Sequence, residues 1–280
     1  MKKNIIILWI ISLIATISVA VYQRITGPTY PKNVKFQVNN NEYKVKFPRS
    51  AENNSDCKIV LPIKDDIKVY LMWKRYKTKD TFQLVEFKKV DGEMVAFLPK
   101  QPPAGKLQYN IQIVNKDKIQ KISDEDIIIR FKGVVPNYVL IPHIIFMFVS
   151  LLFSFRAGLS HFFKDDNKNQ FYVLLTLITL IIGGFLLGPI MQKYAFGEYW
   201  TGFPFGIDLT DNKTLLTFII WLVVYYLGNK IKENSKKYAL VGLIIMVMMY
   251  LIPHSTLGSE LDYNKLDKQK IEKVTKQNEQ

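Results

Sequence analysis

The hydrophobic pattern of this chain changes character twice along its length. A continuous apolar run covers residues 5–21, residues 28–133 then alternate apolar and polar side chains, and long apolar runs return after Pro136. Alternation with a period of two is typical of strands with one buried face, whereas apolar runs of about 17–25 residues can form membrane-spanning helices. The pattern therefore predicts a mixed membrane protein with an all-β middle part.

The first apolar run follows Lys2 and Lys3. A cleavable signal peptide is one interpretation, because Ser18, Val19 and Ala20 resemble the small residues of a cleavage site. The run is longer than most signal-peptide cores, so residues 1–25 are expected to form an uncleaved signal-anchor helix. In either case the segment that follows is exported.

The alternating part is predicted to form an extracytoplasmic all-β domain over residues 27–133. Turn residues at 39–41, 91–92 and 102–105 separate runs of alternating apolar side chains, as in Val34, Phe36 and Val38. Seven or eight short strands of this kind favour an immunoglobulin-like or fibronectin-like sandwich. The single cysteine, Cys57, leaves Trp73 without a disulfide beside it, which argues against an antibody-type domain.

Four further apolar runs, 138–155, 171–191, 214–227 and 238–252, predict a four-helix transmembrane bundle over residues 136–254. The last two runs are short, so they must borrow flanking residues or cross a thinned bilayer. Gly184 and Gly188 are spaced for close helix packing, although they could instead mark a kink. Thr210 or Asp211 stands where the fourth of the five spans needs an N-cap.

The outer loop 192–213 combines many aromatic residues with glycines and prolines, and Tyr194 and Trp200 are the side chains most typical of a headgroup-level belt. A flexible linker would contain few such rings. We expect this loop to form an ordered aromatic cap on one membrane face.

The formal net charge of +14 comes from lysines spread over strands, loops and tail, without a recognised nucleic-acid motif, so no nucleic-acid partner is expected. Lys and Arg are concentrated in segments 156–170 and 229–237, which predicts that both are cytoplasmic. The chain is thus expected to be integral to the cytoplasmic (inner) membrane. The β domain, the aromatic cap and the polar tail 255–280 then lie on the outer (periplasmic) side.

Two of the chain's three histidines, His143 and His254, share the tripeptide Ile-Pro-His, and both are predicted near the outer leaflet. An ionisable residue inside an apolar helix suggests function, and two imidazoles could bind a b-type haem or a metal. Asp208, Asp211 and Glu260 could complete a metal site with them. The alternative is structural: His143 bonds a carbonyl, His254 lies among headgroups, and Ser259 with Asp262 caps a short helix before a frayed end.

Familiar catalytic and phosphate-binding motifs are missing, and the motifs present identify no characterised family. Two hypotheses remain. In the first, the chain is a non-enzymatic binding or assembly subunit of the cell envelope, anchored in the lipid bilayer, whose β domain contacts another envelope protein. In the second, it is an electron-transfer subunit that binds haem or a metal through His143 and His254.

Overall fold

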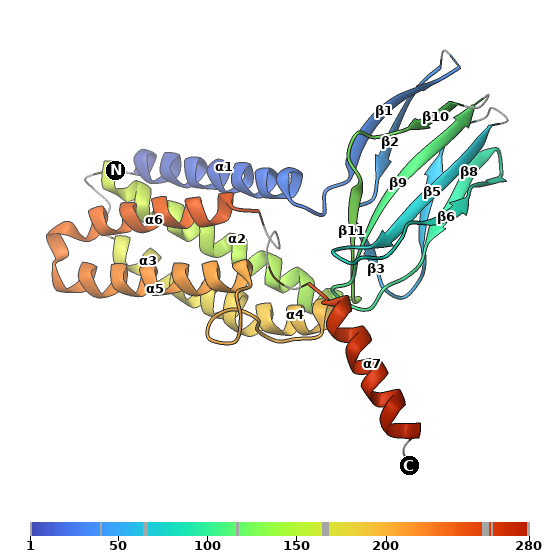
Figure 1. Cartoon of the computed structure of the whole chain (residues 1–280). Coiled ribbons are helices and arrows are strands. Elements are labelled where there is room, and N and C mark those ends of the chain that lie inside the picture. Colours follow the sequence, from blue (N-terminus) through green and yellow to red (C-terminus); the bar gives the residue numbers. More distant parts are fainter. Residues whose placement is uncertain are drawn as a thin grey trace. The chain divides into compact units, whose positions relative to one another are not determined.

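The computed structural model describes residues 2–39, 41–63, 67–115, 118–163, 168–253, 258 and 260–278. The chain forms two compact units (Figure 1). The helical unit contains Met1–Pro28 and Val135–Ser259, and the β unit contains Thr29–Val134 and Glu260–Gln280. The C-terminal tail therefore folds with the strands rather than with the helix that precedes it.

The helical unit contains the expected apolar helices. Helix α1 covers Lys2–Thr26, α2 covers Asn137–Leu159, α5 covers Leu209–Lys230 and α6 covers Ser235–Leu251. Between α2 and α5, the helix α3 (Asn169–Leu180), the π-helical segment η2 (Ile181–Leu187) and α4 (Gly188–Phe196) follow one another without a break. Two 3-10 turns, η1 (Ser160–Phe162) and η3 (Lys232–Asn234), lie after α2 and before α6.

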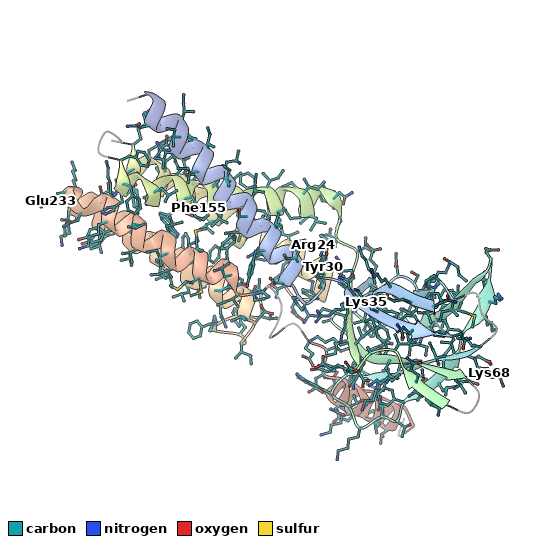
Figure 2. All side chains as sticks on the ribbon, turned by 90° about the horizontal axis from the view of Figure 1, so that it is seen from above. Arg24, Tyr30, Lys35, Lys68, Phe155 and Glu233 are labelled. Atoms are coloured by element: carbon teal, nitrogen blue, oxygen red, sulfur yellow. The ribbon has the colours of Figure 1, made fainter. Side chains whose placement is uncertain are left out.

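These helices share one hydrophobic core. Trp221 of α5 is fully buried beside residues of α2, α3 and α6, and its indole N–H donates to the Sδ atom of Met246 at 3.1 Å. Phe155, labelled in Figure 2, lies among the same helices. Large apolar side chains also point outward from every one of these helices, including Ile14, Ile145, Ile178, Val223 and Ile244. A polypeptide with apolar residues on both its inner and its outer face is suited to lipid.

Three helices in the described part of the chain are long and apolar enough to cross a membrane: Asn4–Thr26, Asn137–Phe162 and Asn169–Phe196. Helices α5 and α6 do not meet this criterion by themselves. They have 22 and 17 residues, about 33 and 26 Å at 1.5 Å per residue, so both extend beyond their short apolar runs.

The β unit contains three sheets in its described residues. The largest has the strand order β3 (Ser50–Glu52), β11 (Ile127–Lys132), β9 (Lys106–Asn115), β5 (Lys68–Arg75) and β6 (Gln83–Glu86), with β10 (Lys118–Lys121) paired to β9. A second sheet has the order β4 (Cys57–Leu61), β8 (Glu93–Leu98) and β7 (Lys88–Val90). A two-stranded ribbon joins β1 (Lys32–Val38) to β2 (Asn41–Phe47).

One hydrophobic core is shared by all three sheets, with Phe36, Phe47, Leu61, Leu71 and Phe131 among its buried residues. The burial pattern of β1 alternates strictly, as the sequence predicts. The described strands number eleven rather than seven or eight, because β3, β6, β7 and β10 have only three or four residues each. Such short segments carry too few alternations to be recognised in a sequence.

The tail contains a helix after Asp262, and this helix continues through most of the residues that were expected to be frayed. Helix α7 runs from Tyr263 to Asn278, and the carboxylate of Asp262 accepts from the amides of Asn264 and Lys265, as an N-cap does. The other half of the expected cap, Ser259, lies outside the described residues. Tyr263 is only 4% exposed, which explains why the first turn of α7 is held in place.

Candidate functional site

His143 directly follows Pro142 in α2, and its ring bonds to the backbone of the π-helical segment. Its Nδ1 atom is 2.9 Å from the carbonyl oxygen of Gly183, so Nδ1–H donates to that oxygen. The same carbonyl also accepts from the amide of Gly188. This arrangement fixes the ring and leaves Nε2 as the nitrogen available to accept a proton or a ligand.

A cavity of about 80 Å³ adjoins His143. Its walls include Gln192 of α4 together with Asp208, Asp211 and Thr214. Liquid water occupies about 30 Å³ per molecule, so the space suits two or three waters or a small polar ligand. A haem needs a pocket in the range of several hundred Å³ and does not fit this cavity.

Asp208, rather than Thr210 or Asp211, is the N-cap of α5. Its Oδ1 atom accepts from the amides of Thr210 at 2.8 Å and Asp211 at 3.2 Å. The sequence prediction was wrong by two or three residues, because Thr210 and Asp211 already belong to the helix. Gly258, with a φ of +91°, lies so close to Asp208 that a Cβ atom there would be 2.5 Å from its Cα.

Asp211 holds the aromatic loop instead of capping the helix. Its Oδ2 atom accepts from the amides of Thr201 at 2.7 Å and Gly202 at 3.0 Å. The next residue, Asn212, accepts from the amide of Phe203 at 2.6 Å. Consecutive side chains on the first turn of α5 therefore fix three consecutive amides of the loop.

The predicted aromatic residues divide into inward and outward groups. The ring of Trp200 stacks on Phe185 at 5.8 Å, and its indole donates to the carbonyl of Phe203 at 3.0 Å. Tyr194 is 42% exposed, with its hydroxyl 3.5 Å from that of Tyr138. Other rings of the loop also face outward, namely Tyr199, Phe203 and Phe205.

The two glycines of the predicted packing motif have different neighbours. A Cβ atom on Gly184 would lie 2.7 Å from Cγ2 of Thr214, so Gly184 permits close approach of α5. A Cβ atom on Gly188 would lie 3.7 Å from Cε1 of His143, which is ordinary contact. The segment η2 is π-helical and contains Gly184. The close packing and the irregular helix, which the sequence offered as alternatives, therefore occur in the same segment.

Two long side chains fasten the end of α6. Gln23 of α1 donates to the carbonyl of Tyr250 at 2.6 Å, and Lys213 of α5 donates to the carbonyl of Ile252 at 2.6 Å. The last carbonyls of a helix have no partner within it, and cations there also suit the helix dipole. Gln23 could not be predicted from the sequence, because its partner is 227 residues away.

In the β unit, Glu260 binds the tail to the strands. Its Oε2 atom lies 2.9 Å from Nζ of Lys106 and 3.2 Å from Nζ of Lys77. Burial raises the pKa of Glu260, but the bonds from Lys106 and Lys77 outweigh it and hold that pKa below its usual value. The amide of Leu261 donates to the carbonyl of Ala104 at 3.1 Å.

Arg75 of β5 makes a second attachment of the tail. Its guanidinium donates to Asp80 at 2.6 and 3.1 Å and to Asp267 of α7 at 3.0 Å. The hydrogen bonds from Arg75 lower the pKa of Asp80. The ring of Tyr263 lies 5.1 Å from the guanidinium, and its hydroxyl donates to Oε1 of Gln101 at 2.9 Å. Burial raises the pKa of Tyr263 to about 12.

A polar groove of about 380 Å³ lies beside this attachment. It is lined by Trp73, Lys74, Arg75, Asp80, Thr81, Gln83 and Gln101. The indole N–H of Trp73 is buried and donates to no atom of the described residues. A buried donor without an acceptor is unusual in a folded protein and calls for an explanation. Sequence reasoning missed this groove because the loop between β5 and β6 has no recognisable motif.

The structure brings together only part of the predicted metal site. His143, Asp208 and Asp211 line one cavity, whereas Glu260 is engaged in the other unit and His254 lies outside the described residues. Within the described ranges, no three His, Cys, Asp or Glu side chains are grouped so as to hold a metal ion.

Comparisons of the chain with protein-family models, with curated proteins and with solved structures find no match.

Proposed function

We propose that the chain is a polytopic protein of the cytoplasmic (inner) membrane, and that its β unit acts on the outer side as a non-enzymatic binding or assembly subunit of the cell envelope. The observation that carries this proposal is the fastening of the tail, through Glu260, Tyr263 and Asp267, to the β unit. An immunoglobulin-like or fibronectin-like sandwich suits this role but is not required by it.

The tail constrains how the helices cross the bilayer. The chain leaves the β unit after Val134 and re-enters it at Glu260. A folded, water-exposed unit lies on one side of the membrane, so the chain between these points crosses an even number of times. Helix α2 and the continuous α3–η2–α4 segment account for two crossings. Helices α5 and α6 then cross as a pair, which makes a four-helix transmembrane bundle beside α1.

Outward-facing side chains support crossing by α5 and α6. Ile219, Leu222 and Val223 of α5 and Ile244 and Met248 of α6 are between 44% and 52% exposed in the isolated chain. Such residues are stable against lipid tails. The aromatic loop between α4 and α5 exposes rings that suit the headgroup zone, as a cap on the outer face does.

The engagement of the polar side chains supports a non-enzymatic role. Asp208 and Asp211 accept backbone amides, His143 donates to a backbone carbonyl, and Glu260 pairs with lysines. The first three groups fix segments of backbone, and Glu260 fixes the tail to the strands. A catalytic acid or base needs instead to reach a substrate proton.

Site-specific photo-crosslinking in intact cells tests the proposal. A photoreactive amino acid replaces one exposed β-unit residue at a time, Leu84, Phe97 or Ile119, with Ile14 of α1 as the lipid-facing control. We expect a discrete adduct with one envelope protein from at least one β-unit position and none from Ile14. The captured protein, once purified, should bind the detergent-solubilised chain saturably. Absence of an adduct from all three positions contradicts the proposal.

A divalent metal site is a second candidate, favoured by the bond from His143 to Gly183. Histidine ligands commonly donate their other ring N–H to a backbone carbonyl, which leaves Nε2 for the metal. Asp208 or Asp211 could contribute an oxygen from the same cavity, and His254 is the remaining predicted ligand. Metal analysis of the purified chain is the test: stoichiometric metal lost in His143→Ala supports this candidate, and a metal-free folded protein removes it.

A further inference from the structure

We propose that the free edge of β6 is the binding site of the β unit, and that it takes an extended segment of a partner protein as an added antiparallel strand. This inference rests on the proposed function and names the form of the partner's segment. It combines three observations: unpaired backbone groups on β6, an exposed apolar side chain beside them, and the lack of a lysine that would discourage pairing.

The backbone of β6 offers donors and acceptors on its free side. In the described part of the chain β6 ends the largest sheet and pairs with β5 alone. The amide of Phe87 donates to the carbonyl of Val69 at 2.9 Å, and hydrogen-bonded pairs alternate along the ladder from there. The N–H and C=O groups of Leu84 and Glu86 therefore point away from β5. Donors and acceptors at this spacing match an extended backbone.

The side chain of Leu84 favours an apolar residue in the added strand. Leu84 is 58% exposed and points to the outer face of the sheet, because its neighbour Val85 packs against the core. Met72, directly opposite Leu84 in β5, is half-buried on the same face. A residue of the added strand that lies opposite Leu84 would share this face with both side chains. If that residue is apolar, it removes Leu84 from water.

The other edge strands of the β unit are less suited to pairing. Strands β4, β7 and β10 and both strands of the ribbon each carry at least one lysine, which discourages the addition of a strand. Strand β3 has no lysine but only three residues. Strand β6 has neither lysine nor arginine, and its one charged residue, Glu86, stands at its end. Among the edges that the structure describes, β6 is therefore the longest without this protection.

A defined peptide tests the proposal on the full chain in detergent. The probe is the blocked heptapeptide Thr-Thr-Val-Thr-Val-Thr-Thr, whose two valines lie on one face of an extended strand. Two N-methylated forms are matched controls: one lacks the N–H groups of the two valines, and the other lacks those of the threonines that precede them. Calorimetry reports the affinities, and hydrogen exchange followed by mass spectrometry reports the location.

We expect the probe to bind saturably and to slow exchange in the segment that contains Leu84 and Glu86, but not in the segment that contains Phe97. Methylation of the valines should weaken binding about tenfold or more relative to methylation of the threonines, because the valine amides face β6.

Variants of the chain make the same comparison from the other side. Glu86→Pro removes an N–H that points away from β5 and leaves the ladder intact, which edge strands tolerate. Glu86→Gln loses the same charge but keeps the N–H, so it should bind the probe about tenfold more tightly than Glu86→Pro does. Lys58→Gln, on an edge strand of the second sheet, should bind the probe as the wild type does.

Three results overturn the proposal: no saturable binding, equal affinity of the two methylated peptides, or equal affinity of Glu86→Pro and Glu86→Gln. If Glu86→Pro fails to fold, Leu84→Lys, which adds the missing cation, should abolish binding in its place. A wild-type dimer in detergent that is lost in the Glu86 or Leu84 variant would show that a second copy occupies the edge, which also overturns the proposal.

The crosslinking experiment separates this inference from the proposed function. We expect the adduct from Leu84 and none from Phe97 or Ile119, which lie on β8 and β10. An adduct from Phe97 or Ile119 but not from Leu84 would keep the envelope role and remove the β6 site. Probe binding at β6 without any crosslink in cells would remove the envelope role but not the site.

Discussion

At the scale of single residues, polar side chains inside the helical unit mostly hold backbone. Asp208, Asp211, Lys213 and Gln23 each satisfy amides or carbonyls that helix ends and loops leave open. An unsatisfied buried group costs about 1–3 kcal/mol, so these four side chains are needed wherever water is excluded. Burial of a polar residue is therefore weak evidence for chemistry in this protein.

Asp211 gives the clearest test at this scale. Asp211→Ala leaves the amides of Thr201 and Gly202 without their acceptor, and we expect a loss of roughly 1–3 kcal/mol together with a loosened loop. Asp211→Asn keeps an acceptor oxygen and should lose less. Chymotrypsin cleavage at the exposed Phe205 reports the loop, and the thermal unfolding midpoint in detergent reports stability. Equal behaviour of the two variants would contradict this role.

The ion pairs of Glu260 predict a pH dependence for tail docking. The pKa of Glu260 is lower in the folded chain than in the unfolded chain, so its ionised form contributes stability above about pH 4.5. That contribution is lost as the pH falls through the folded pKa.

At pH 7 we expect the wild type to have a higher thermal midpoint than Glu260→Gln. The corresponding difference in the free energy of unfolding is about 1 kcal/mol or less. The difference between the two thermal midpoints should disappear at acid pH. Glu42→Gln, at an exposed position in β2, serves as the control. A gap that stays constant from pH 7 to pH 3 would show that the charge of Glu260 contributes nothing.

At the scale of elements, the packing of the π-helical segment against α5 depends on one glycine. A methyl group on Gly184 would meet Cγ2 of Thr214 at 2.7 Å, and overpacking of this kind typically costs 1–3 kcal/mol. We expect Gly184→Ala to be destabilising by about 1 kcal/mol, since alanine recovers part of the cost through helix propensity.

Thr214→Ser removes the clashing methyl and keeps the hydroxyl that donates to the carbonyl of Thr210. The double variant Gly184→Ala with Thr214→Ser should therefore recover most of the lost stability. Thermal unfolding of all four proteins gives the coupling energy. Additive effects would mean that the two residues do not contact each other.

The helices and strands were more predictable from the sequence than the caps and long-range contacts that hold them in place. The burial pattern of β1 and the extent of α2 follow from local periodicity, which a single sequence displays. The cap at Asp208 was misplaced because three residues with side-chain acceptors, Asp208, Thr210 and Asp211, stand close together at the start of α5. The docking of Tyr263 could not be predicted, because it depends on a partner 162 residues earlier, although an aromatic residue in a polar tail was a usable signal.

At the scale of the whole molecule, both apolar parts of the chain are followed by residues of the β unit. Helix α1 leads into it, α2 leads out of it, and the segment after α6 returns to it. The proposed topology therefore has an even number of membrane crossings between Val135 and Ser259. This part of the proposal does not depend on the lysine distribution, from which the orientation is predicted.

Labelling of single cysteines in intact cells tests that arrangement. In a Cys57→Ser background, cysteines at Glu42 and Tyr199 should react with a membrane-impermeant maleimide from outside. A cysteine at Glu233, between α5 and α6, should react only after the cells are permeabilised. Labelling of Glu233 from outside would show that α5 and α6 do not cross as a pair.

The bond between Gln23 and Tyr250 has a consequence for biogenesis. Gln23 leaves the ribosome well before its acceptor, which is 227 residues further along the chain. Throughout translation the glutamine amide must therefore remain with water or with an insertase. A nascent chain that stops before α6 has no Tyr250 carbonyl to accept this amide, so the attachment of α1 to the end of α6 forms only after α6 has been made.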